Sequence, residues 1–365
     1  MSSTWNRMLK LAIFGESHGS AIGMTLDNLP AGESIDLNAL RDFTDRRTAK
    51  KGDSTSTART EPDFPELISG FYNGKTTGTP LTGIIRNTDT RSGDYNNIQY
   101  LARPGHADYT GQVRYHGAND LRGGGHFSGR LTAPLTLAGG ICKQIIEKRG
   151  IVIASHILSI KNVAEARFDP VNLSPDAARD LQKKRFPLLD PSMEDKMREV
   201  IETAHLNQDS VGGVIECCIL GLPEGLGSPM FDGIENVLSS LIFGIPAVKG
   251  IEFGEGFDAS KLYGSENNDS FYLKNGQVKT RTNHHGGILG GISSGMPVIF
   301  RVAIKPTPSI SKPQQTVDTK KLKETELIVN GRHDPCIAVR AAVVVEAAAS
   351  IAVLDLMMEH GIITL

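Results

Sequence analysis

The segment RGGGHFSGRLTAP at residues 122–134 combines residue types that bind anions. Three consecutive glycines free the backbone from the limits set by Cβ atoms, so it can approach a ligand closely. Ser128 and Thr132 are typical helix openers, and the residues that follow are apolar at helical spacing. The start of a helix favours negative charge, and Arg122 and Arg130 add guanidinium groups suited to phosphate or carboxylate. A tight turn before a buried helix is the alternative, but the flanking arginines and the histidine favour an anion site.

Two further segments bring histidine into polar turns. The sequence GESHG at residues 15–19 follows a short predicted strand, and its flanking glycines indicate a sharp turn from which side chains project into a cleft. His18 is there either a general acid or a residue that bonds locally in the turn. The sequence LARPGHADY at residues 101–109 has no periodic pattern and places Arg103 three residues before His106. This spacing can bring a cation and a proton donor into one pocket.

The C-terminal third contributes a lysine and a carboxylate. Val298, Phe300 and Val302 alternate in a predicted strand, which ends in a proline-punctuated loop that begins with Lys305. Asp334 precedes a proline and then a long Ala/Val/Ile-rich segment at residues 336–360. Asp334 is therefore either a helix N-cap residue or a functional group. The long helix is apolar on nearly all sides, so we expect it to be buried within the fold.

Two motifs imitate other kinds of site. SGFYNGKTT at residues 69–77 resembles the phosphate loop of nucleotide hydrolases, but it is one residue short and has Ser69 at the place of the first glycine. Asn73-Gly74 instead predicts a hairpin, and we exclude ATP binding. His284 and His285 are adjacent, but no cysteine or carboxylate lies at ligand spacing, so no metal is expected. The glycines at 286–291 are interpreted as admitting a flat ligand.

Turn residues and hydrophobic spacing predict the elements that must position these groups. Asp36 opens a helix with Leu40 and Phe43 on one face, and this helix ends at Arg46-Arg47. Residues 48–60 lack periodicity and are long for a connector, which predicts a functional lid. Further helices and strands are expected at residues 131–148, 151–160, 209–220, 236–243, 248–253 and 298–304, with another helix opened by Asp190-Pro191.

Composition limits the possible functions. The 365 residues carry a net charge of −2, so no overall field attracts nucleic acid or an anionic membrane. The four cysteines have no paired spacing, no signal peptide is recognisable, and no run of 18 uncharged apolar residues occurs. We therefore expect a soluble, cytoplasmic protein. A single domain over residues 1–365 is expected. Each half of the chain has strands, then a glycine-rich loop, then an apolar helix, which leaves open that the two halves are related.

Seven segments occur in series across almost the whole chain. They are GESHG at 15–19, RPGHADYT at 103–110, RGGGHFSGRLTA at 122–133, DSVGG at 209–213, GGILGGISSGMPV at 286–298, KPTPSI at 305–310 and GRHDPC at 331–336. Together and in this order they resemble the chorismate synthase family. Any one of them is moderately specific, whereas the ordered set is highly specific.

The resemblance implies a lyase of the shikimate pathway and of aromatic amino acid biosynthesis. Such an enzyme removes phosphate and a ring proton from 5-enolpyruvylshikimate 3-phosphate by anti-1,4-elimination to give chorismate, using reduced FMN (FMNH2) without net redox change. The implied fold is α+β, a β-α-β sandwich with two antiparallel sheets around a central layer of helices, assembled as a homotetramer. The length suggests the monofunctional type, which depends on an external flavin reductase, and NADP is associated with the activity.

The resemblance also implies residue roles. Catalytic roles fall to His18, His106 and Asp334, the histidines as proton donors to the leaving phosphate or the flavin and the aspartate in relaying the ring proton through the flavin. Substrate anions are assigned to Arg47, Arg103, Arg130 and Arg332. Contacts to FMN are assigned to His126, Phe127, Ser128, Ala247, Gly290, Lys305, Pro306, Thr307, Pro308, Ser309 and Arg332.

The chain departs from the family pattern after the triple glycine. Many members have an arginine where this chain has His126, followed here by Phe127, so the contact on the phosphate side is expected to differ. Two other classes of protein remain as alternatives. A phosphoryl-transfer enzyme needs a nucleotide loop, which the chain imitates only defectively. A flavin-binding protein without catalysis would need neither His18 nor His106.

Overall fold

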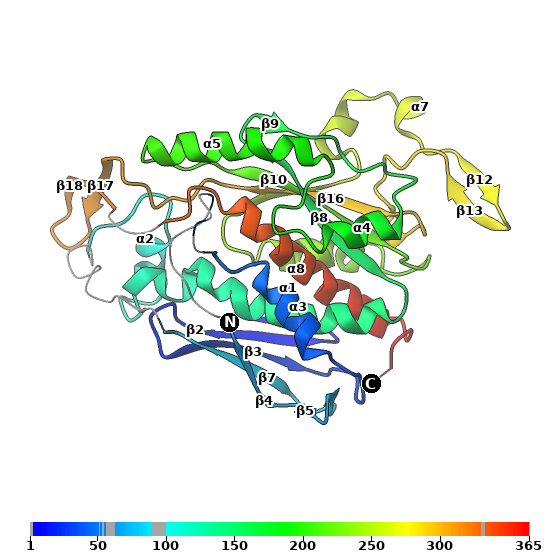
Figure 1. The fold of residues 1–365 in the computed structure, drawn as a ribbon, viewed down its shortest axis with the longest axis horizontal. Coiled ribbons are helices and arrows are strands. Elements are labelled where there is room, and N and C mark those ends of the chain that lie inside the picture. The colour runs from blue at the N-terminus through cyan, green and yellow to red at the C-terminus, as the bar shows by residue number, and fades with distance from the viewer. Residues whose placement is uncertain are drawn as a thin grey trace.

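Two five-stranded antiparallel sheets enclose a layer of helices in the computed structural model, which describes residues 3–50, 52, 55, 63–88, 100–329 and 333–364 (Figure 1). The first sheet has the order β1-β2-β3-β7-β4, with β1 Thr4–Asn6, β2 Lys10–Gly15, β3 Ala21–Asp27, β7 Leu81–Arg86 and β4 Pro65–Ser69. The second has the order β11-β16-β10-β8-β9, with β11 Val248–Phe253, β16 Val298–Ile304, β10 Gly213–Leu220, β8 Val152–Ile160 and β9 Val163–Ala164. The predicted α+β sandwich is confirmed.

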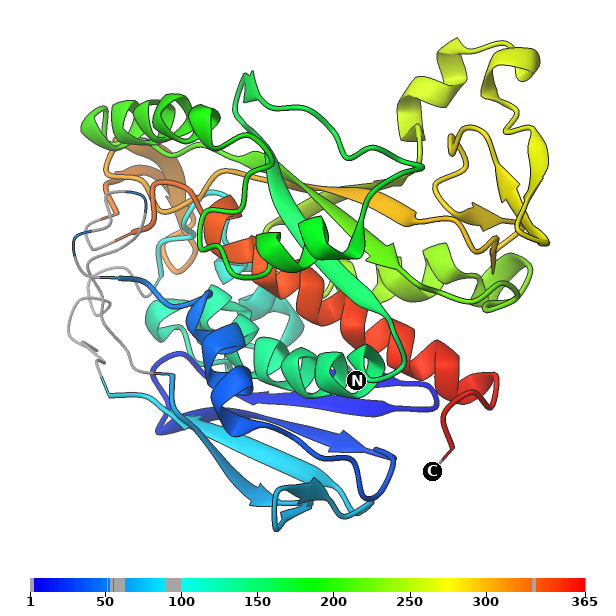
Figure 2. The ribbon, with the colours of Figure 1, turned by 45° about the vertical axis from the view of Figure 1, so that its right-hand side comes forward.

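Helices α3 (Thr132–Glu147) and α8 (Ala338–Glu359) lie between the sheets and pack against each other. Figure 2 shows them crossing the middle of the molecule, α3 next to the first sheet and α8 beneath the second. A Cβ atom on Gly139 would lie 2.4 Å from Cα of Ala347, so this glycine sets how closely the helices approach. One cluster of buried apolar side chains runs from the first sheet through both helices to the second sheet.

Helix α8 is buried along nearly its whole length, as its apolar composition predicts. Its length and hydropathy would allow it to cross a membrane, but 94% of its most apolar window lies inside the protein. Two of its charged residues are neutralised in the core. Glu346 accepts hydrogen bonds from both terminal nitrogens of Arg46, at 2.6 and 2.9 Å, and Asp355 forms an ion pair with Arg7 at 2.9 Å.

The shorter helices cover the edges and outer faces. Helix α1 (Leu37–Asp45) packs on α3, and the Asp36 side chain accepts hydrogen bonds from the next turn, as predicted. Helix α6 (Ile234–Ile242) packs on α8, while α4 (Pro175–Leu181) and α5 (Glu194–Leu206) lie on the outer side of the second sheet (Figure 1). The remaining two are α2 (Asp108–Arg114) and α7 (Gly264–Asn267).

Asn-Gly turns form two of the small hairpins. Asn73 and Gly74 have φ values of 48° and 77° and join β5 (Phe71–Tyr72) to β6 (Lys75–Thr76), which confirms the predicted turn. Asn275 and Gly276, at 52° and 79°, make the same turn between β12 (Phe271–Lys274) and β13 (Gln277–Thr280). This second hairpin was not predicted from the sequence, although Asn275-Gly276 carries the same turn signal as Asn73-Gly74. Two further hairpins pair β14 (Ile288–Leu289) with β15 (Ile292–Ser293), and β17 (Gln314–Asp318) with β18 (Lys323–Leu327).

Candidate active site

A cavity of about 1010 Å³ opens where the first turns of α3 and α8 meet the ends of β1 and β2 and the loops that follow α6 and β16. It gathers most of the predicted site residues from segments far apart in the chain. Those that line it are His18, Arg47, His106, His126, Phe127, Ser128, Arg130, Ala247, Lys305, Thr307, Pro308, Ser309 and Asp334. Apart from histidines, the described part of its wall contains four basic side chains and two carboxylates.

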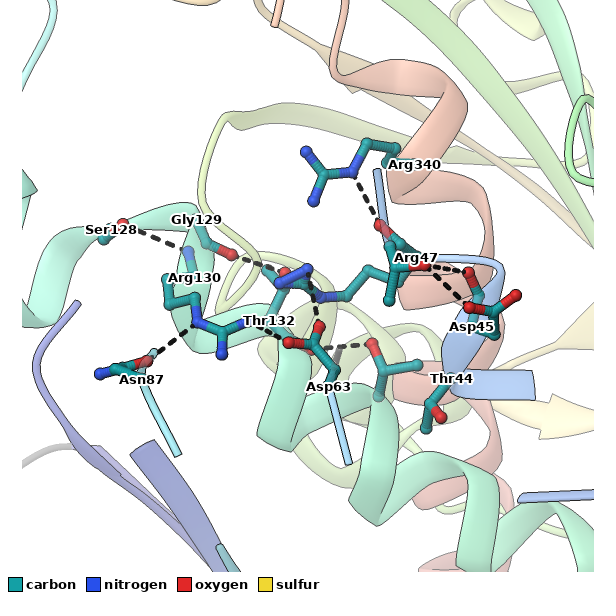
Figure 3. Close-up of polar contacts among 12 residues, drawn as sticks. Thr44, Asp45, Arg47, Asp63, Asn87, Ser128, Gly129, Arg130, Thr132 and Arg340 are labelled. Carbon is teal, nitrogen blue, oxygen red and sulfur yellow. Dashed lines mark hydrogen bonds and ion pairs between the residues drawn. The ribbon is translucent and has the colours of Figure 1, made fainter. Parts of the chain in front are cut away.

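Arg47 and Arg130 face one carboxylate. Arg47 follows the end of α1, and Arg130 lies in the short 3-10 helix Gly129–Leu131 that leads into α3. Asp63 lies between them, with Oδ2 3.6 Å from Nη1 of Arg47 and Oδ1 in contact with Nη1 of Arg130 (Figure 3). Nε of Arg130 also donates to Oδ1 of Asn87 at 3.1 Å. Asp63 was not predicted, because nothing in its local sequence distinguishes it from a surface carboxylate.

Arg340 was noted in the sequence only as an exception in an apolar helix, yet it connects two predicted site residues. From the first turn of α8 its Nε donates to the backbone carbonyl of Arg47 at 2.7 Å, and its Nη1 contacts Oδ2 of Asp334 at 2.7 Å (Figure 3 shows the first of these). Ile337, not Asp334, occupies the N-cap position of α8. The N-cap alternative for Asp334 is therefore wrong, and this carboxylate is oriented at the cavity wall by an ion pair.

Burial strongly affects Arg47. Its side chain is 5% exposed, and loss of water, together with repulsion from Arg340 and Arg130, lowers the pKa of its guanidinium to about 10 although Asp63 opposes the shift. Its Nε donates to no other described group. A buried guanidinium in this condition favours an incoming anion, because a second negative charge would supply the missing acceptor.

The triple glycine allows its own backbone and the ring of His18 to approach closely. Gly123, Gly124 and Gly125 all have positive φ, and a Cβ atom on Gly123 would lie 2.2 Å from Cε1 of His18. The glycine loop therefore makes room for the catalytic candidate His18 and does not itself need to cradle a ligand. Arg122, predicted to flank the anion site, points outward to Asp120 and does not line the cavity, so that prediction is wrong.

His18 is oriented by its neighbour Ser17. Its Nδ1 lies 3.1 Å from the hydroxyl of Ser17, and the same hydroxyl lies 3.2 Å from the carbonyl of Arg122. The Ser17 hydroxyl thus links the His18 ring to the glycine loop. His18 itself is buried at the cavity wall.

His106 is positioned by the predicted loop of Lys305 and Ser309. Its Nε2 lies 2.8 Å from the hydroxyl of Ser309, and Nζ of Lys305 donates to the carbonyl of Gly105 at 2.6 Å. Burial, followed by the nearby charges of Arg103 and Lys305, lowers the pKa of His106 to about 4. The expectation that both protonation states are available near neutrality is therefore wrong for the free protein, in which His106 is neutral.

His126 bridges two strand ends. Its Nδ1 lies 2.8 Å from the carbonyl of Gly15, and its Nε2 lies 2.5 Å from the hydroxyl of Ser3. The His126 side chain is thus committed to the protein's own backbone and N-terminal segment. Phe127 and Ser128 follow at the cavity wall.

Three of the predicted site residues that the structure describes do not line the cavity. Arg103 is buried behind it and makes two ion contacts with Asp108, at 2.7 and 2.8 Å, so it acts on the site through its charge. Pro306 belongs to the lysine loop, but its ring lies near Gly212 and not at the cavity wall. Gly290 lies in the β14–β15 turn near the other end of α6. Arg332 and most of the predicted lid at 48–60 lie outside the described residues.

The glycine-rich stretch before β16 was interpreted as a place for a flat ligand. A Cβ atom on Gly286 would lie 2.4 Å from the backbone nitrogen of Gly254, and one on Gly287 would lie 2.5 Å from the carbonyl of Pro297. Neither glycine lines the cavity. These residues therefore allow two segments of this chain to pack closely, and the interpretation as a ligand site is wrong for them.

Comparison with known proteins agrees with this arrangement. A family model described as chorismate synthase matches residues 9–358. The chorismate synthase of Pyrococcus abyssi (strain GE5 / Orsay) is 44% identical over 349 residues, which is 96% of each chain, and that of Korarchaeum cryptofilum (strain OPF8) is 43% identical over 97% of each chain. A solved structure described as a crystal structure of chorismate synthase superposes with a TM-score of 0.75 at 26% identity, covering 96% of this chain and 92% of that chain. The chain belongs to the chorismate synthase family.

Proposed function

We propose that this chain converts 5-enolpyruvylshikimate 3-phosphate into chorismate in the cavity described above. As a member of the chorismate synthase family it is a lyase of the shikimate pathway. The observation that carries the assignment of the site is that Arg47, Arg130, His18, His106 and Asp334 come from separate segments and line one cavity. Expelling phosphate requires anion binding, proton donation and removal of a ring proton, and these residues supply the three kinds of group.

The basic groups of the wall match a substrate with one phosphate and two carboxylates. Two unit charges about 4 Å apart attract by roughly 4 kcal/mol near a protein surface, so several guanidinium groups can favour departure of phosphate strongly. We assign Arg47 and Arg130 to the substrate anions, as the resemblance implies, and add Arg340 as the residue that orients Arg47. Arg103 contributes at longer range, and the role of Arg332 stays a prediction.

Proton donation falls to His18 and His106. A neutral His106 can donate a hydrogen bond at once, but it protonates the leaving phosphate only if its pKa rises. An approaching phosphate dianion has this effect, since negative charge near an imidazole favours the protonated form. His106 is then acidic only when substrate is bound. Asp334, oriented by Arg340, is assigned to the uptake of the ring proton.

The cavity also fits the reduced FMN that the resemblance implies. Its volume lies at the upper end of the range of about 300–1,000 Å³ for small-molecule sites, which is large enough for substrate and cofactor together. Apolar side chains form part of its wall, among them Leu135, Ile337 and Ala341, and Lys305 and Ser309 add polar groups at another part. When bound, reduced FMN supplies an electron-rich ring beside the substrate without net redox change. Phe127, Ser128, Ala247 and the lysine loop are the described residues proposed to hold it.

Assembly and location complete the proposal. A homotetramer, an external flavin reductase, a role for NADP in that supply and a cytoplasmic location all come from the family resemblance. The four cysteines are buried thiols without a disulfide, which agrees with a reducing compartment.

Anaerobic incubation with reduced FMN and 5-enolpyruvylshikimate 3-phosphate tests the reaction. We expect equal amounts of chorismate, followed by its absorbance, and of free phosphate. Replacing both His18 and His106 by alanine should abolish turnover while flavin binding persists, whereas His205→Ala on the distant helix α5 should change neither. Unchanged phosphate release by the double variant would exclude the proposed histidine roles and favour another catalytic group.

A further inference from the structure

Asp63 occupies the position at which an anion would bind. Its side chain is 4% exposed, and each of its two carboxylate oxygens faces a different guanidinium, one of Arg47 and one of Arg130. Phosphate and carboxylate ligands present paired oxygens to arginines in the same way. Both arginines also line the cavity, so Asp63 lies on the side from which a ligand arrives (Figure 3).

The contact with Arg47 is incomplete. The distance of 3.6 Å from Nη1 to the carboxylate exceeds that of a hydrogen bond, and Nε of this buried side chain has no hydrogen-bond partner among the described residues. The backbone of Arg47 is fixed independently, because its carbonyl accepts from Arg340. Arg47 is therefore held in place by its main chain, while its guanidinium is only partly satisfied by Asp63.

We propose that Asp63 is an internal counter-ion that occupies an anion subsite in the free enzyme and is displaced when an anionic group of the substrate binds between Arg47 and Arg130. This inference rests on the proposed function in so far as the cavity binds an anionic substrate. Without Asp63, two buried guanidinium groups would face each other with no negative charge between them. A ligand with a single charge and one acceptor gains little over the resident carboxylate, whereas a phosphate dianion brings more charge and more acceptors. Asp63 thereby makes the subsite selective for strongly anionic groups.

The binding of inorganic phosphate to the full chain, without flavin or enolpyruvyl substrate, tests this assignment. Asp63→Asn keeps the size and one acceptor but removes the competing charge, so the Kd for phosphate should fall about tenfold or more. Its Tm without phosphate should also fall, and phosphate should restore it. Glu66→Gln is the matched control, because it removes the same charge from a residue that lies three positions away and pairs with Arg86 on the surface. It should leave the Kd unchanged.

The site of binding is checked by adding Arg47→Gln to the Asp63→Asn variant, which should cancel the gain. Equal or weaker phosphate binding by Asp63→Asn would show that Asp63 does not compete with the anion and would overturn the proposal. Should Asp63→Asn fail to fold, a crystal structure of the wild-type chain with phosphate decides: Asp63 must have left the two arginines, and an unmoved Asp63 refutes displacement. Because no turnover is measured, this result and that of the chorismate assay can fail separately.

Discussion

The low pKa of His106 predicts a measurable dependence of stability on pH. In the folded protein the pKa is about 4, because burial and then the charges of Arg103 and Lys305 disfavour the imidazolium, while an unfolded histidine titrates near its ordinary value of 6.5. Between these values the unfolded chain binds a proton that the folded chain does not. Stability is therefore lost as the pH falls from about 6.5 toward 4. At pH 4.5 the loss due to this one group amounts to about 2.5 kcal/mol.

Urea unfolding of the wild-type chain and of His106→Gln, followed by circular dichroism, isolates this contribution. Other groups titrate in both proteins, so their effects cancel in the difference. Between pH 7.5 and pH 4.5 the wild type should lose about 2.5 kcal/mol more than the variant. His205→Gln, on the exposed end of α5, should follow the wild type. A difference below about 0.5 kcal/mol, or one of opposite sign, would refute the low pKa and with it the argument that His106 is neutral in the free enzyme.

The same residue links stability to catalysis. Histidine NMR should find the pKa of His106 raised by Lys305→Met, since a like charge is removed, and raised again when inorganic phosphate binds in the cavity. A pKa that does not respond to phosphate would mean that the anion binds away from His106. His18 would then be the only remaining histidine proposed to protonate the leaving group.

Three further substitutions test the surroundings of the site. Glu346→Gln should reduce the free energy of unfolding by about 3–5 kcal/mol, because it leaves Arg46 buried without its carboxylate, and adding Arg46→Met should recover part of that loss in urea unfolding. Arg340→Met should lower kcat/KM about tenfold or more with an unchanged circular dichroism spectrum, because Asp334 and the backbone of Arg47 lose their common anchor, and an unaltered kcat/KM would refute that role. Burial disfavours the charged form of His156, but hydrogen bonds to two buried glutamates outweigh it and raise the pKa of this histidine. The stability that His156 contributes is therefore full below about pH 6.5 and is lost as the pH rises through the raised pKa. His156→Gln should abolish this alkaline loss of stability, measured by unfolding between pH 6 and 9.

Local signals in the sequence predicted the parts of the structure that local physics determines. Asn73-Gly74 forms a turn because both residues tolerate positive φ, and Asp36 caps α1 through its own side chain. The apolar helix at residues 336–360 had to be buried wherever it lay. The family resemblance, and not residue spacing, singled out His18, His106, Arg47 and Arg130. The structure places these residues around one cavity, and their roles stay predictions.

What the sequence did not reveal are contacts between distant segments. A run of glycines indicates that something approaches closely, but not whether it is a ligand or the ring of His18, more than a hundred residues away. Asp334 followed by proline has the pattern of an N-cap, and only the fold shows that Arg340 is its partner. Asp63 carries no local signal at all, because its role depends on two arginines from other elements.

Helix α8 explains how a partly satisfied arginine can be tolerated at the cavity. Two side chains of this helix hold adjacent residues: Glu346 binds the guanidinium of Arg46, and Arg340 binds the carbonyl of Arg47. Both contacts are made by groups that do not belong to the Arg47 side chain. The main chain that carries Arg47 is thus anchored independently of its guanidinium. Because α8 positions the backbone of Arg47 through contacts within the protein, the guanidinium does not have to hold its own main chain, and its binding energy remains available for the anion.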